Sequence, residues 1–172
     1  LLACCGLFMF NNIEDAHDDA LIETKKSINP ISSHSLDLKQ ASVVTLVSLF
    51  FAVFLFFAVG VNTGILGLFM ILLGVLYSWR RVRLKSIPVL DIVAHSLIAS
   101  LAFVLGSTVG QLDISPNYFI MFFAVFALST VGDINNEIRD NEVDRLANIK
   151  NTATKFNLKS ISKLLSLTTI IA

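Results

Sequence analysis

The sequence predicts an all-α protein, a bundle of helices that crosses a membrane several times. Hydrophobic residues make up 55% of its 172 residues, only 15% are charged, and the mean hydropathy is +0.75. Apolar segments without period-two alternation predict helices, since an open sheet edge would leave backbone groups unpaired in lipid. Each segment is close to the length that crosses about 30 Å of hydrocarbon; the expected spans are 41–61, 63–79, 92–112 and 116–132.

The two ends of the chain are expected to be parts of further helices. An apolar run ends at Phe10 and continues directly into acidic residues, so residues 1–19 are predicted to be the end of a helix. This run lacks the charged start and the small-residue cleavage site of a signal peptide. Residues 158–172 are predicted to start another helix, because the apolar pattern there has no cap or stop signal. We therefore expect a single membrane domain over residues 1–172, truncated at both ends.

Turn residues predict short connections that pair the four spans into two helical hairpins. Asn62, in Val-Asn-Thr-Gly, is expected to form the first turn, and residues 113–117, in Asp-Ile-Ser-Pro-Asn, the second. Two crossings separate each polar stretch from the next, so the polar stretches 11–40, 80–91 and 133–163 should all lie on one side of the membrane.

Charge is concentrated on that one side. Every Lys and Arg lies in the three polar stretches, and Asp113 is the only acid in an opposite loop. By the positive-inside rule we expect this side to be cytoplasmic and the spans to lie in the cell membrane, in contact with membrane lipid. The formal net charge is zero, so the sequence provides no overall basic field to attract nucleic acid.

The first acidic stretch follows the apolar run directly and reads Asn-Asn-Ile-Glu-Asp-Ala-His-Asp-Asp from residue 11. On a helix, Asn11, Asp15 and Asp19 are spaced i, i+4 and i+8, so their oxygens project from one side at successive turns. Like charges at this spacing repel each other. A hard divalent cation with oxygen ligands is the simplest means of offsetting that repulsion, and magnesium is the expected ion.

The second acidic stretch has a sharper pattern. Its carboxylates are spaced i, i+4, i+7 and i+11, which at about 100° per residue places them in a narrow stripe on one helix face; they are Asp133, Glu137, Asp140 and Asp144. Glu142 lies off this stripe. Magnesium usually joins protein carboxylates to substrate phosphates, so two such faces suit a substrate with a diphosphate group.

A basic segment lies between the two acidic stretches, directly after an apolar segment that ends in Tyr77-Ser78-Trp79. Its cations are expected to hold phosphate oxygens, although cations at this position also serve membrane topology and contact lipid head groups; they are Arg80, Arg81, Arg83 and Lys85. Two polar residues near the third span have simpler interpretations. Asp91 is expected to start a helix and His95 to be a polar packing residue.

These motifs resemble those of the UbiA family of prenyltransferases. Asn11, Asp15 and Asp19 resemble its first aspartate-rich motif, and Asp140-x-Glu142-x-Asp144, preceded by Asn-Glu-Ile-Arg, resembles the second. Tyr-Ser, followed by Arg-Leu-Lys and then Pro88, is similar to the segment between them. The order of motifs and spans agrees over essentially the whole chain.

The resemblance implies an incomplete all-α bundle that uses Mg²⁺ to transfer a prenyl group from an isoprenoid diphosphate to a lipophilic acceptor, with release of pyrophosphate. It implies catalytic roles for four metal-binding aspartates, namely Asp15, Asp19, Asp140 and Asp144. The expected diphosphate-binding residues are Lys26, Tyr77, Arg81, Arg83, Lys85, Arg139 and Lys150. The truncated chain alone is expected to be inactive.

Two positions depart from the family pattern. Asn12 stands where the family usually has Asp, and Asn29 stands where Arg is common, so a metal role for the first and a phosphate role for the second are in doubt.

Two alternative functions stay open at this point. One is a CDP-alcohol phosphotransferase-like enzyme, although its D-G-x-x-A-R lead is missing; the other is a membrane cation transporter.

Overall fold

A computed structural model describes residues 1–110, 116–146 and 149–171, and the described residues contain helices, turns and loops but no strand. The prediction of an all-α fold is therefore confirmed. The helices form two compact units, one from Leu1 to Arg83 and one that begins at Leu84. The prediction of one domain over residues 1–172 stays a prediction.

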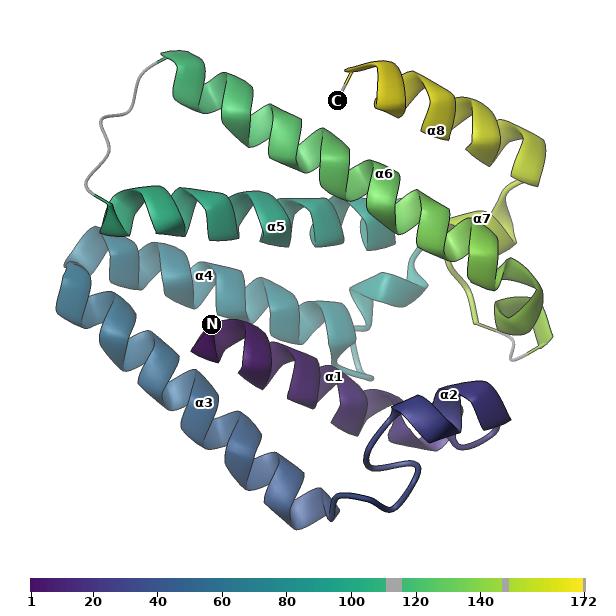
Figure 1. The fold of residues 1–172 in the computed structure, drawn as a ribbon, viewed down its shortest axis with the longest axis horizontal. Helices are drawn as coiled ribbons and strands as arrows, with labels where there is room; N and C mark the ends of the chain where they lie inside the picture. Colours follow the sequence, from purple (N-terminus) through teal and green to yellow (C-terminus); the bar gives the residue numbers. More distant parts are fainter. Residues whose placement is uncertain (111–115, 147–148, 172) are drawn as a thin grey trace. The chain divides into compact units, whose positions relative to one another are not determined.

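The first unit packs three long helices and one short helix. They are α1 (Leu2–Asp19), α2 (Glu23–Ile28), α3 (Leu38–Val59) and α4 (Val61–Ser78). Helix α3 packs against both α1 and α4, and α1 also contacts α4 (Figure 1). Helices α1 and α4 run in the same direction, so their C-terminal ends lie at the same end of this unit. The acidic end of α1 is thereby brought close to the segment that follows α4.

The turn between α3 and α4 is at Gly60, and the prediction of a turn at Asn62 is wrong. Gly60 has extended backbone between two helices, and its carbonyl accepts the N–H of Gly64 at 2.8 Å, so α4 starts at Val61. Glycine is a poor helix residue and interrupts the chain here. Asn62 lies in the first turn of α4, where a polar side chain is tolerated. For the second predicted connection, residues 113–115 lie outside the described residues, while Pro116 occupies the first position of α6, which suits proline.

Buried glycines let α4 approach its neighbours closely. Gly64, Gly67 and Gly74 lie on its buried side. A Cβ atom at Gly74 would lie 2.6 Å from Cδ1 of Leu7 in α1, and one at Gly67 would overlap the ring of Phe56 in α3. Small residues at helix interfaces are typical of membrane bundles, where close backbone approach replaces the hydrophobic driving force.

Replacing Gly67 with alanine is expected to lower the free energy of unfolding by about 1–3 kcal/mol, because the added methyl displaces the Phe56 ring in a packed interface. Gly106→Ala is the matched control: among the described residues, no atom outside its own helix backbone lies within 4 Å of its Cβ position, so only the better helix propensity of alanine is added, by up to about 1 kcal/mol. Thermal melting of both variants in detergent measures the difference. Equal melting temperatures for the two variants would contradict the packing argument.

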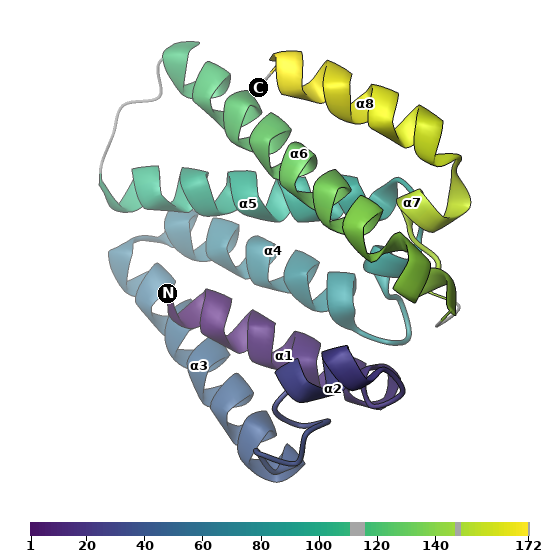
Figure 2. The same cartoon turned by 45° about the vertical axis from the view of Figure 1, so that its right-hand side comes forward.

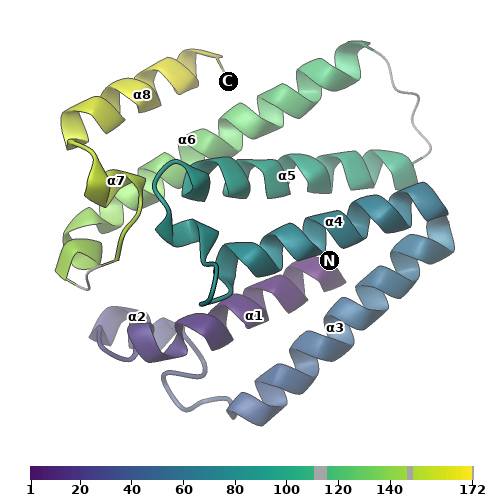
Figure 3. The same cartoon turned by 180° about the vertical axis from the view of Figure 1, so that it is seen from behind.

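The second unit is organised around one long helix. Its elements are η1 (Leu84–Ser86), α5 (Leu90–Val109), α6 (Pro116–Leu146), α7 (Thr152–Lys155) and α8 (Leu158–Ile171). Helix α6 contacts α5, α7 and α8 (Figure 2), and α5 and α6 run in opposite directions (Figure 3). A small core forms where α5, α6 and α8 each contribute a buried isoleucine; these are Ile92, Ile134 and Ile161.

Four described helices are long and apolar enough to cross a membrane, judged by length and composition; the segments are Leu38–Val59, Val61–Ser78, Leu90–Val109 and Pro116–Glu142. They coincide with the four predicted spans to within a few residues at the starts. The fourth is longer than predicted, because α6 continues without a break through the second acidic stretch to Leu146. The acidic stripe is therefore carried by the same rigid helix as the apolar segment before it.

Candidate functional site

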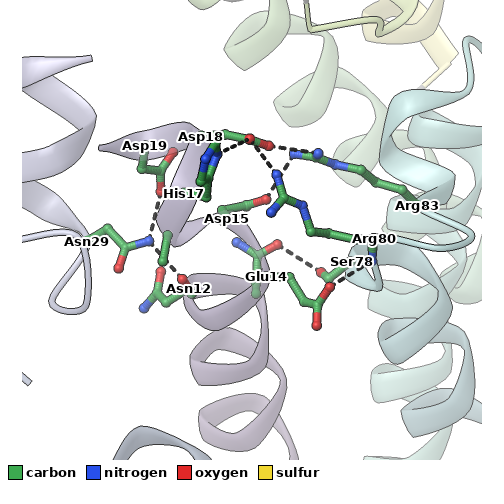
Figure 4. Close-up of polar contacts among 12 residues, drawn as sticks. Asn12, Glu14, Asp15, His17, Asp18, Asp19, Asn29, Ser78, Arg80 and Arg83 are labelled. Carbon is green, nitrogen blue, oxygen red and sulfur yellow. Dashed lines mark hydrogen bonds and ion pairs between the residues drawn. The ribbon is translucent and has the colours of Figure 1, made fainter. Parts of the chain in front are cut away.

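The first acidic stretch forms the C-terminal end of α1 and is in contact with residues from two other segments (Figure 4). Oδ1 of Asn11 accepts a hydrogen bond at 2.8 Å from the hydroxyl of Ser78, the last residue of α4. Oδ2 of Asp19 accepts one at 2.8 Å from Nδ2 of Asn29. The helical spacing predicted for these oxygens is therefore present, and each predicted ligand is oriented by a neighbouring segment.

The basic segment after α4 lies over this acidic face. Nη2 of Arg83 donates to Oδ1 of Asp15 at 3.1 Å, and its Nη1 is 2.8 Å from Oδ2 of Asp18. Nη2 of Arg80 donates to Oδ1 of Asp18 at 2.7 Å, and the backbone N–H of Arg80 donates to Oε2 of Glu14, also at 2.7 Å (Figure 4). Three acidic side chains of α1 thus hold both the side chains and the backbone of one basic turn.

These cations affect the ionisation of Asp18. Partial burial raises the pKa of its carboxyl, but the hydrogen bond and charge of Arg83 and the charge of Arg80 outweigh that effect, so the pKa lies below its usual value. Asp18 is therefore ionised at neutral pH and remains a partner for both guanidinium groups.

Asn29 is a buried connector, although the sequence left its role in doubt. Its side-chain N–H groups bond Asp19 and the backbone oxygen of Asn12, and its Oδ1 accepts the N–H of Ile31 at 3.0 Å. With 2% of its surface exposed, Asn29 fixes the loop after α2 to the end of α1. A neutral amide serves here because it must donate to a carboxylate and accept from the backbone at once.

The remaining predicted diphosphate residues fall into different places. In the first unit, Arg81 stacks over the ring of Trp79 at 5.7 Å, Lys26 lies in α2, and Tyr77 lies half-buried in α4. In the second unit, Lys85 lies in η1, Arg139 pairs with its neighbour Asp140 at 3.0 Å, and Lys150 is exposed. A common phosphate site formed by these residues stays a prediction.

The second acidic stripe divides into buried and accessible carboxylates. Asp133, Glu137 and Asp144 are at most 9% exposed, whereas 41% of the Asp140 side chain is exposed. Oε2 of Glu137 accepts the backbone N–H of Ala153 at 2.8 Å, and Oδ2 of Asp144 accepts Nδ2 of Asn151 at 2.9 Å. Glu137 and Asp144 therefore also hold the start of α7.

Asp91 completes this polar cluster, in a role that the sequence did not reveal. It lies in the first turn of α5, as expected for a helix-start residue, but it is only 1% exposed. Its carboxylate accepts both the backbone N–H and the hydroxyl of Thr152, as well as the N–H of Ile92 at 2.8 Å. His95, expected to be a packing residue, lies with Nδ1 3.7 Å from Oδ1 of Asp133 and 3.3 Å from Oγ of Ser129.

Several of these contact residues were not predicted as site residues. Glu14 and Asp18 form their own i, i+4 pair on α1, so a helical plot would have separated them from the Asn11, Asp15 and Asp19 row. No local signal identifies Asp91 as the partner of Thr152, because the two lie 61 residues apart in the sequence.

The donor atoms of both acidic stretches suit magnesium, which prefers carboxylate and amide oxygens. Asp133 adds a specific indication, because its Oδ2 is buried and has no hydrogen-bond partner in the described part of the chain. Over residues 1–110, 116–146 and 149–171, however, no three acidic, histidine or cysteine side chains are gathered as a metal site. The predicted ligand sets therefore remain predictions about residues whose chemistry fits the ion.

Comparison with known proteins gives the same family as the motifs. The family model described as "UbiA prenyltransferase family" matches residues 1–172. None of the curated proteins gives a significant match. The chain is similar in structure to a UbiA homolog from Archaeoglobus fulgidus bound to GPP and Mg²⁺, with a TM-score of 0.80 and 25% identity, covering 99% of this chain and 63% of that one.

Other structures of a UbiA homolog from the same organism agree. A structure described without a ligand gives a TM-score of 0.74 at 26% identity, with 99% of this chain and 63% of that chain covered. One bound to Cd²⁺ gives 0.76 at 23% identity, covers 99% and 62%, and supports the fold alone. The sequence thus spans less than two thirds of the length of these relatives. Because the family model extends over all 172 residues, the chain belongs to the UbiA prenyltransferase family.

Proposed function

We propose that the protein containing this chain transfers a prenyl group from an isoprenoid diphosphate to a lipophilic acceptor, depends on Mg²⁺ and releases pyrophosphate. The observation that carries the proposal is the end of α1, where Asn11, Asp15 and Asp19 present oxygens on successive turns beside the guanidinium group of Arg83. Acidic oxygens suit the metal ion of a metal–diphosphate complex, and the guanidinium group suits its phosphate oxygens. The end of α1 brings both kinds of group together.

The residues of this chain have complementary roles in that proposal. Asn11, Asp15 and Asp19 of α1 would hold Mg²⁺, and the carboxylates of Asp140 and Asp144 in α6 are further candidate ligands. Bound Mg²⁺ would supply Lewis-acid stabilisation of the departing pyrophosphate. Arg83 would donate to phosphate oxygens, with Lys26, Tyr77, Arg81, Lys85, Arg139 and Lys150 as further contacts.

Burial and contacts distinguish two acidic residues within this proposal. Asp133 and Glu137 were predicted as ligands, but both are buried, and Glu137 accepts a backbone N–H from α7. We propose that Glu137, like Asp144, holds the start of α7 in addition to its predicted role as a ligand. Asp133, with one oxygen that has no partner among the described residues, is also a candidate ligand. Asp140, with its more exposed carboxylate, is the better candidate of the stripe for contact with substrate.

The relative from Archaeoglobus fulgidus supports the substrate class, since its structure was solved with GPP and Mg²⁺. Four helices long and apolar enough to span a membrane, together with the family, identify an integral membrane protein. We propose that the acidic and basic segments lie on the cytoplasmic side of the cell membrane. Helix α3 would face lipid, because its apolar side chains are largely exposed, among them Leu46, Phe50 and Phe54.

The test is to incubate the full-length protein in detergent with Mg²⁺, labelled geranyl diphosphate and a panel of lipophilic acceptors, and to identify products by mass. Candidate acceptors are a hydroxybenzoate, a naphthoate, a glycerophosphate lipid, a tetrapyrrole and a carotenoid end group. The expected result is a prenylated product with one pyrophosphate released per transfer, and no product after chelation of Mg²⁺. Cation flux into vesicles without any prenylated product would instead support the transporter alternative.

A further inference from the structure

Asp18 connects the basic turn after α4 to the acidic end of α1. Each of its carboxylate oxygens contacts a different guanidinium group, Oδ1 that of Arg80 at 2.7 Å and Oδ2 that of Arg83 at 2.8 Å. Asp18 lies outside the i, i+4, i+8 row of predicted ligands and is directed toward the basic turn instead (Figure 4).

Arg83 is held in one orientation by two carboxylates. It gives one terminal nitrogen to Asp15 and the other to Asp18, and its side chain is 21% exposed. Its Nε is buried and has no hydrogen-bond partner among the described residues. A guanidinium group is planar with donors in fixed directions, so fixing two nitrogens also fixes where the remaining N–H groups point.

The backbone at Arg83 is also constrained. Its φ of 47° is in the left-handed region, which costs energy for a residue with a side chain, and its N–H bonds the carbonyl of Trp79 at 2.7 Å. Glu14 holds the same turn through the N–H of Arg80. Strain of this kind persists only where surrounding contacts enforce it. At this turn the enforcing contacts come from the acidic side chains of α1.

We propose that Asp18 is a positioning residue for Arg83: it holds the guanidinium against Asp15 so that its remaining donors are presented to the diphosphate. This inference rests on the proposed function. Asp18 itself does not contact substrate. The negative charge of Asp18 offsets the repulsion between the guanidinium groups of Arg80 and Arg83. Asp15 is then the residue that would contact both Arg83 and the metal cation.

The test uses the full-length protein in detergent and measures binding of inorganic pyrophosphate with Mg²⁺ by calorimetry. Asp18→Asn is expected to weaken binding about tenfold, the effect of one weakened charge-assisted hydrogen bond. Asp18→Glu, which keeps the charge, should bind within about threefold of wild type by the same argument. Glu23→Gln removes an exposed acid of α2 and should bind as wild type does.

The link to Arg83 is tested by a double-mutant cycle. If Asp18 acts through Arg83, Asp18→Asn should cause no further loss of binding in an Arg83→Gln background. Additive losses, or wild-type binding by Asp18→Asn, would overturn the proposal. Asp18→Gln provides a second neutral variant if Asp18→Asn melts early. Loss of turnover in Asp15→Asn together with normal binding in Asp18→Asn would reject the positioning role alone, whereas normal turnover in Asp15→Asn would reject the proposed function.

Discussion

Asp15→Asn is expected to reduce Mg²⁺-dependent release of pyrophosphate by at least about a hundredfold, a loss typical of removing one group that stabilises developing charge. Asp15 combines the features expected of a ligand: its side chain is 14% exposed, it lies in the middle of the α1 row, and Oδ1 is already paired with Arg83. The amide keeps the shape of the side chain but removes the negative charge that a hard cation prefers.

The concentration of Mg²⁺ that gives half-maximal rate should also rise in Asp15→Asn, because the substitution weakens binding of the ion. Glu23→Gln is the control for removal of one negative charge from the same unit, and its turnover should equal that of wild type. Measurement of pyrophosphate release with geranyl diphosphate over a range of Mg²⁺ concentrations distinguishes the two variants. Unchanged turnover in Asp15→Asn would remove the basis of the proposed chemistry.

The sequence predicted the helices well because their signals are local. Apolar length located the four spans, and the 3.6-residue period placed both acidic rows on helices, in α1 and α6. The turn at Gly60 was missed by two residues, since both glycine and asparagine are turn residues and only the helix start at Val61 decides between them. The second acidic row was predicted on a helix, but its continuity with the fourth span was not, because a change from apolar to charged residues does not show whether a helix breaks.

The partners of the site residues were not predictable, because they are distant in the sequence. Asn11 bonds Ser78, and Asp15 bonds Arg83, which is 68 residues away. The sequence predicted that Arg83 binds phosphate oxygens, and that role stays a prediction. An isolated motif cannot show that carboxylates of α1 are its partners. Glu137 is a further example: its place in the stripe predicts a ligand, and its contact with Ala153 of α7 is a tertiary property that no local pattern shows.

Asp91→Ala is expected to lower the free energy of unfolding by about 3 kcal/mol, the cost of breaking several hydrogen bonds to a buried carboxyl group and leaving its partners unpaired. Three donors lose their acceptor: the N–H and hydroxyl of Thr152 and the N–H of Ile92. At 1% and 2% exposure, Asp91 and Thr152 are not reached by water that would replace the lost bonds. Melting in detergent with circular dichroism measures the change.

The effect should extend to the turn before α5, and this distinguishes the Asp91 contact from a simple loss of packing. Val89 has a φ of 74°, a strained value for a β-branched residue, and its N–H donates to the Thr152 hydroxyl at 2.6 Å. Thr152→Val removes that hydroxyl but keeps the backbone N–H, so it should cost about 1–2 kcal/mol, and the double variant should cost less than the sum. Glu142→Ala, at an exposed position of α6, should stay within about 0.5 kcal/mol of wild type. If Asp91→Ala had the same melting temperature as Glu142→Ala, the contact of Asp91 with Thr152 would not stabilise the protein. The start of α7 would then be held by Glu137 and Asn151 without Asp91.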